Sequence, residues 1–154
     1  MSPTPDTAAK GTRHRTRHRS REAAVQMLYQ WEVAQSDIDD VLRTFWTANL
    51  PGAEGATDAT KVFAEELVRG TVGNLTKIDP LIAETAEHWR LSRMAALDRI
   101  ILRLAIGEFL HGETPRNVVI NEALELARTF STEESVKFIN GMLDSIRKKI
   151  EART

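Results

Sequence analysis

The chain has 154 residues, of which 42% are hydrophobic and 28% are charged, so it can build one domain with a real core. It contains no cysteine, which excludes disulfides, cysteine nucleophiles and zinc fingers and favours a reducing compartment. The sequence shows no signal peptide and no apolar run long enough to span a bilayer. We therefore expect a cytoplasmic protein without a membrane segment.

Positive charge is concentrated near the N-terminus. Residues 10–21 hold six lysines and arginines and no acid, whereas the whole chain has a net charge of −1, so the other residues carry −7. Residues 1–18 are also rich in Thr, Pro, Arg and His and contain no apolar residue larger than Ala after Met1, which predicts a disordered basic arm. A basic arm on an acidic body indicates a polyanion as partner.

Four helices are predicted in the first part of the body. Helical spacing of apolar residues begins after Ser20, a predicted N-cap, and continues to about residue 35. A second helix is predicted from Ser36. After a loop at residues 50–58, rich in Pro and Gly, a third is predicted from Asp58 to about residue 72. A fourth is predicted to begin at Asp79-Pro80 and to include Trp89.

Three more helices follow around the most apolar stretch. Residues 94–110 are apolar on most of the circumference, which predicts a central helix that ends at Gly112. A sixth helix is predicted at about 118–129, and a capping box from Ser131 to Glu134 opens a seventh. The expected fold is all-α, a compact bundle of about seven helices in two small subdomains, with the disordered basic arm at 1–18 and the helical domain at 19–154.

The sequence contains no recognisable catalytic or metal-binding pattern. The four histidines are at positions 14, 18, 88 and 111, and two of them are in the arm. Glu108 and His111 form a single Glu-x-x-His pair, whereas di-iron bundles use two such pairs and two further glutamates. No Gly-rich phosphate loop, nucleophile elbow or His-Glu-x-x-His motif is present. We therefore expect no enzyme activity and no cofactor.

The arginines of the arm favour nucleic acid as the polyanion. Five of them alternate with Thr, His and Ser between positions 13 and 21. Guanidinium groups bind phosphate bidentately and stack on bases. A charge run alone leaves open a second interpretation, that the arm only increases solubility. Without a helix-turn-helix pattern, RNA or single strands are favoured over duplex DNA.

Four segments match, in order, the helices of a known family. They read REAAVQMLYQWE at 21–32, LDRIILRLAIGE at 97–108, PRNVVINEALELAR at 115–128 and FSTEESVKFINGMLD at 130–144. In these segments the chain resembles the NusB family of bacterial transcription antitermination factors, from about residue 17 to 146. Residues 1–12 have no family counterpart that we can place, and His18 stands where Arg or Lys is commoner in the family.

The resemblance implies a mechanism. Family members pair with NusE, a small-subunit ribosomal protein, and the pair binds boxA RNA and helps RNA polymerase to read through terminators in ribosomal RNA operons. The resemblance and the basic arm together give the expected RNA-binding residues: Arg13, Arg15, Arg17, His18, Arg19, Arg21, Arg103, Lys137 and Phe138. The expected NusE-binding residues are Tyr29, Glu84 and Asp98.

The sequence leaves open other roles for two of these residues and other functions for the whole chain. Phe138 equally fits a core position, and Tyr29 equally fits packing between helices. The chain also fits a helical protein-interaction module, or the NusB-like domain that precedes the catalytic domain of certain ribosomal RNA methyltransferases. The family includes monomers and dimers, so the sequence leaves the oligomeric state open.

Overall fold

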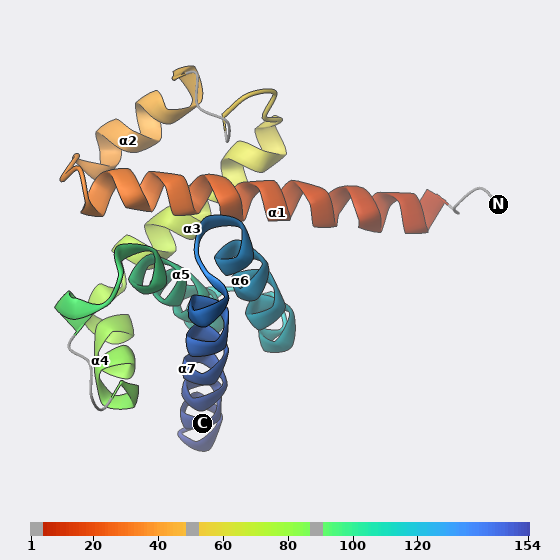
Figure 1. The fold of residues 1–154 in the computed structure, drawn as a ribbon. Helices are drawn as coiled ribbons and strands as arrows, with labels where there is room; N and C mark the ends of the chain where they lie inside the picture. The colour runs from red at the N-terminus through yellow and green to blue at the C-terminus, as the bar shows by residue number, and fades with distance from the viewer. Residues whose placement is uncertain (1–4, 49–52, 87–90) are drawn as a thin grey trace.

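The computed structural model describes residues 5–48, 53–86 and 91–154, with side chains from residue 11 onward in these ranges. There the chain forms seven α-helices, two short 3-10 helices and no strand (Figure 1). The helices are α1 (Pro5–Glu32), α2 (Ile38–Thr44), η1 (Phe45–Thr47), α3 (Asp58–Val72), α4 (Leu75–Thr85), η2 (Leu91–Arg93), α5 (Ala96–His111), α6 (Arg116–Phe130) and α7 (Glu133–Ala152). The predicted all-α class with about seven helices is confirmed.

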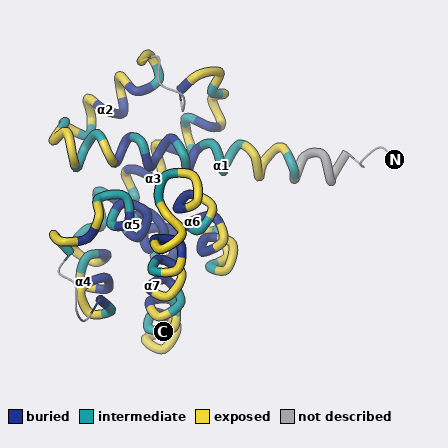
Figure 2. The backbone as a smooth tube through the Cα atoms, in the orientation of Figure 1, coloured by how far each residue is buried: buried dark blue, intermediate teal, exposed yellow. Residues whose placement is uncertain are grey.

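Helix α5 lies at the centre of the bundle, as its all-round apolar sequence predicts. It contacts α1, α3, α4, α6 and α7, and ten of its sixteen residues are buried. Gly107 lets α3 approach closely, because a Cβ at this position would lie 3.3 Å from Thr71 Oγ1. The buried segments face the middle of the molecule (Figure 2), and side chains from all seven α-helices form one core.

Helix α1 begins earlier than the sequence predicts. Residues 5–18, which we expected to be disordered, continue the helix, and Ser20, the expected N-cap, lies buried inside it. Ser20 Oγ donates to the backbone carbonyls of Thr16 at 2.9 Å and Thr60 at 2.8 Å. Arginine is a good helix former, and this anchoring of residue 20 on α3 favours continuation of the helix toward the N-terminus. The outer part of α1 therefore extends beyond the bundle as a rod (Figure 1).

Other helix ends differ from the prediction by a few residues. Helix α4 begins at Leu75, so Pro80 lies inside the helix rather than in its first turn. Pro80 is exposed in the middle of this eleven-residue helix, where it removes one intrahelical hydrogen bond. Trp89, expected on this helix, lies outside the described residues. The side-chain N-caps are Asp37, Thr57 and Thr132, each one residue away from the predicted Ser36, Asp58 and Ser131.

Candidate RNA and partner interface

The outer part of α1 presents exposed cationic groups. Arg13, His14 and Arg15 are all exposed. Arg15 Nη2 makes one long contact, 3.5 Å, with Thr12 Oγ1. His14 Nε2 lies 3.6 Å from an oxygen of Glu122. These guanidinium groups are therefore open to a phosphate, which they can bind bidentately.

The next three arm residues are half-buried and anchored on the body. The Arg17 guanidinium lies over the Phe63 ring, 4.6 Å from its centroid. His18 Nδ1 lies 2.9 Å from Glu122 Oε2. Arg19 Nη2 donates to the backbone carbonyl of residue 54 at 2.6 Å. These contacts fix the direction of the arm, and only the exposed edges of the three side chains can meet a ligand.

Arg21 and Arg103 are internal ion-pair residues. Arg21 is 3% exposed and donates through Nε and Nη2 to both oxygens of Glu108, at 2.9 and 2.7 Å. Arg103 donates through Nε and Nη2 to both oxygens of Asp79, at 2.9 and 3.0 Å, and through Nη1 to Glu32. The pairs join α5 to α1 and α4. The donors assigned to RNA at these two positions are thus occupied inside the protein.

The sequence contained one signal for the first of these pairs. Glu108 lies among apolar residues on the most buried helix, and its side chain is only 6% exposed. A buried carboxylate needs a cation or several donors, so Glu108 required a basic partner from another helix. The same pair explains the lone Glu-x-x-His pattern, because the Glu108 carboxylate is already bonded to Arg21.

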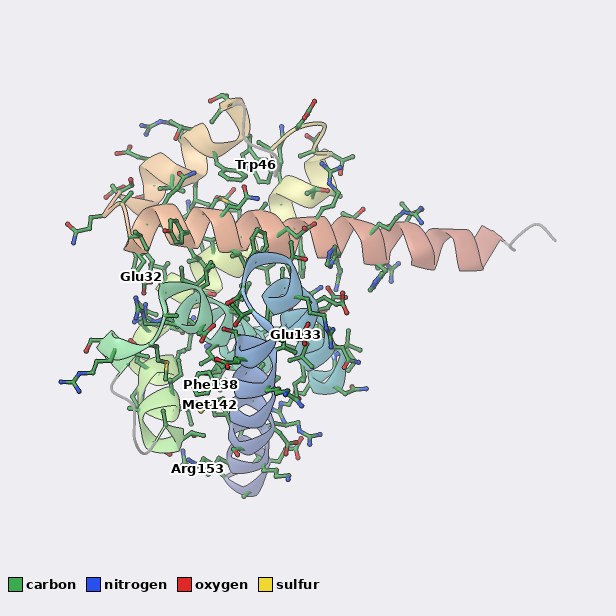
Figure 3. The ribbon with its side chains drawn as sticks, in the orientation of Figure 1. Glu32, Trp46, Glu133, Phe138, Met142 and Arg153 are labelled. Atoms are coloured by element: carbon green, nitrogen blue, oxygen red, sulfur yellow. The ribbon has the colours of Figure 1, made fainter. Side chains whose placement is uncertain are left out.

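A cavity of about 350 Å³ brings together Asp98 and Phe138, which the sequence assigned to different ligands. Phe138 is half-buried, packs against the core and lies near the Glu133 end of α7 (Figure 3). Asp98 is 9% exposed, and its Oδ1 has no hydrogen-bond partner in the part of the chain that the structure describes. Lys137 is exposed beside Phe138. A buried oxygen without a donor is costly, so this cavity is suited to a ligand that supplies an N–H.

The other two expected partner residues lie apart from each other. Tyr29 is 43% exposed near the end of α1, and Val33, one turn later, is 46% exposed. Sequence reasoning missed Val33, which adds an apolar contact to this surface. Glu84 instead pairs with Arg153 at 2.9 Å, at the end of α7 opposite Glu133 (Figure 3). The structure therefore does not bring Glu84 together with Asp98.

Two further observations concern metals and membranes. Within residues 5–48, 53–86 and 91–154, no three His, Cys, Asp or Glu side chains are arranged to hold a metal ion. No helix in these ranges combines the length and apolarity that crossing a bilayer requires.

A central apolar helix, a projecting basic helix and a cavity beside the last helix together define a class of small helical binding protein. The sequence pattern of the NusB family matches residues 18–148. The chain is 46% identical over 138 residues to the transcription antitermination protein NusB of Koribacter versatilis, with 89% of this chain and 92% of that protein covered. The chain belongs to the NusB family.

Solved structures agree with this assignment. T. maritima NusB is similar with a TM-score of 0.76 and 38% identity, over 86% of this chain and 90% of that one. A chain in the crystal structure of antitermination factors NusB and NusE in complex with double-stranded RNA is similar with a TM-score of 0.67 and 26% identity, over 88% of this chain and 98% of that one.

Proposed function

We propose that this chain is a transcription antitermination factor that binds boxA-type single-stranded RNA together with NusE and helps RNA polymerase to read through terminators in ribosomal RNA operons. The observation that carries the proposal is the exposed group of cations at the projecting end of α1 in a NusB-family chain. The similarity to transcription antitermination proteins favours antitermination over a methyltransferase domain or a pure protein-interaction module. We place this role in the cytoplasm and assign no catalytic step to the chain.

The proposed RNA surface has an outer and an inner part. Arg13 and Arg15 bind phosphates, because their guanidinium groups are open to solvent. The inner part contributes the exposed edges of Arg17, His18 and Arg19 on α1, together with exposed Lys137 and half-buried Phe138 on α7. An aromatic face beside a lysine supplies base stacking and a phosphate contact together. Arg21 and Arg103 are left out of this surface, because their donors are bonded to carboxylates inside the protein.

The proposed NusE surface combines the exposed end of α1 with the cavity at Asp98. Tyr29 and Val33 offer apolar area, and exposed tyrosines are frequent anchors of protein interfaces. Asp98 Oδ1, which has no hydrogen-bond partner among the described residues, accepts a hydrogen bond from the partner protein. Glu84 is not included, because it pairs with Arg153 at the other end of α7.

The proposal is tested by titrating the protein, with and without NusE, into labelled boxA RNA and a scrambled control at several salt concentrations. We expect selective binding that tightens with NusE and weakens steeply with salt. The Arg13→Gln/Arg15→Gln variant should lose affinity and reduce the steepness of the salt dependence by about 1.4, or 0.7 for each phosphate contact on a single strand. Arg43→Gln is the matched control, since Arg43 is an exposed arginine that pairs with Asp40 on α2.

Two results would contradict the proposal. Equal binding to boxA and scrambled RNA, unaffected by NusE, would remove the antitermination role. Unchanged RNA affinity in the Arg13→Gln/Arg15→Gln variant would show that the basic arm does not bind RNA. Tyr29→Ala separates the two surfaces, because it should weaken NusE binding and leave the affinity for RNA alone unchanged.

A further inference from the structure

A second cavity, of about 360 Å³, lies where α1, α3 and α5 meet. Its lining includes Arg17, Phe63, Glu66, His111 and Glu113. Arg17, Phe63 and Glu66 also line an adjoining groove of about 730 Å³ between α1 and α3, which includes Arg13. A strand bound to the exposed arginines of the arm would therefore pass the mouth of this cavity.

The carboxylate at the bottom of the cavity has its hydrogen-bond acceptors occupied, whereas the carboxylates at its mouth have theirs free. At the bottom, both oxygens of Glu108 already accept hydrogen bonds from Arg21. At the mouth of the cavity, the side chains of Glu66, His111 and Glu113 are exposed and form no hydrogen bond or ion pair with any other residue that the structure describes. The carboxylates at the mouth are therefore free to accept hydrogen bonds from a ligand, and a carboxylate accepts two parallel N–H bonds well.

A flat stacking surface borders the same space. Phe63 is half-buried, and the planar Arg17 guanidinium covers its ring at 4.6 Å, with Arg21 at 5.4 Å from the same centroid. Arginine planes and aromatic rings are the surfaces on which RNA-binding proteins stack unpaired bases. A basic peptide could also pair with the carboxylates, but Arg13 and Arg17 line the groove that leads to the cavity, and their positive charges would repel such a peptide.

We propose that this cavity receives one guanine base of the bound RNA, an inference that rests on the proposed RNA-binding function. Guanine carries two adjacent donors, N1–H and the N2 amino group, and the Glu66 or Glu113 carboxylate accepts both. The face of the guanine stacks on the Arg17 guanidinium that covers Phe63. Adenine and cytosine place a ring acceptor beside their amino group, which a carboxylate repels. Uracil presents a single ring N–H between two carbonyls.

The test uses the full chain and three oligouridine RNAs of about 12 nucleotides, within the range of single-strand site sizes. Each RNA carries one central guanosine, inosine or adenosine, and inosine lacks only the N2 amino group. We expect the guanosine RNA to bind about tenfold tighter than the adenosine RNA, as a bidentate contact implies, with inosine between them. The ratio of affinities is the readout, because removing any carboxylate strengthens RNA binding in general.

A pair of variants assigns the preference to the cavity. Glu66→Gln/Glu113→Gln should reduce the guanosine preference to about twofold or less, because the acceptor pair is lost. Glu65→Gln is the control, since Glu65 is the neighbouring carboxylate on α3 and bonds to Arg69 at 3.0 Å rather than lining the cavity. It should keep the full preference. Circular dichroism melts verify that the variants fold.

The outcomes separate the inference from the proposed function. If the unmodified protein binds boxA RNA but shows no guanosine preference, the cavity inference fails and the RNA-binding function stands. A preference that persists in the Glu66→Gln/Glu113→Gln variant would place guanine recognition elsewhere and also overturn the inference. Absence of binding to boxA RNA and to all three oligouridines would overturn both.

Discussion

Replacing Arg21 by methionine tests whether the most buried cation of the basic segment holds the fold together or binds RNA. The Arg21 and Glu108 side chains are 3% and 6% exposed and share two hydrogen bonds. Methionine has a similar shape but no charge, so it would leave the Glu108 carboxylate buried without its cation. Removing one partner of a buried ion pair costs about 3–5 kcal/mol of unfolding free energy.

A second variant isolates the cause of that loss. In Arg21→Met/Glu108→Leu neither charge of this pair remains, and apolar replacement of a whole buried pair is often close to neutral. The variant still loses the 3.4 Å contact from Arg21 to Thr114 and the stacking of Arg21 on Phe63. We therefore expect it to be about 1 kcal/mol less stable than the unmodified protein, and clearly more stable than the single variant.

Urea unfolding followed by circular dichroism measures both effects. With a slope of about 2 kcal/mol per molar urea, a loss of 3–5 kcal/mol lowers the midpoint by about 2 M. RNA affinity of the folded single variant, measured in the absence of urea, should remain close to that of the unmodified protein. A stable Arg21→Met variant with lost RNA affinity would refute the structural role. A double variant no more stable than the single one would refute the explanation by an unpaired carboxylate.

Three further predictions concern other helix contacts. Arg103→Gln should lower the unfolding free energy by about 2–4 kcal/mol and leave RNA affinity unchanged, because Arg103 bonds to Asp79 and Glu32; a loss of RNA affinity without a loss of stability would contradict this. Thr132→Ala should cost about 1 kcal/mol in urea unfolding, and more than Ser131→Ala, because Thr132 Oγ1 accepts from the Ser135 N–H. Hydrogen bonds from Lys148 and then Arg147 hold the pKa of the Asp144 carboxyl below its ordinary 3.8. Its contribution to stability is thus present above the unfolded-state pKa and is lost as the pH falls through the folded value. NMR titration should show the pKa of Asp144 rising toward 3.8 in Lys148→Gln, and no rise would argue against the bond.

The features predicted correctly depend on local sequence patterns. The all-round apolar stretch predicted the central position of α5, and its end beside Gly112 follows from the same segment. The prediction of seven helices came from the periodicity of apolar residues, and the family resemblance came from four sequence segments in the order of the family's helices. Such patterns act within a few turns of one helix, which is the range over which sequence spacing fixes side-chain geometry.

The features that the sequence did not predict depend on distant contacts. Arg21 and Glu108 are 87 positions apart, so nothing near Arg21 distinguishes it from the arginines that stay exposed. The composition of residues 5–18 indicated disorder, but Arg17 on Phe63 and His18 beside Glu122 anchor the inner end of this segment on the body, and the helix continues outward from there. Two neighbouring polar residues can each serve as the N-cap of a helix, and tertiary packing determines which of them does. The observed caps therefore differ from the predicted ones by one residue.

Because α1 is one uninterrupted helix from the basic end to the buried end, the orientation of its cations is tied to the core by the pitch of the helix. Each residue turns the helix by about 100° and advances it by about 1.5 Å. One alanine inserted near residue 16 would swing Arg13 and Arg15 to a different side of the rod, although charge and composition would hardly change. Four inserted residues would return the two arginines almost to their original side of the helix, about 6 Å farther from the core. The direction in which the arginines project is therefore set by the number of residues between them and the core, and the proposed RNA contact depends on that direction as well as on charge.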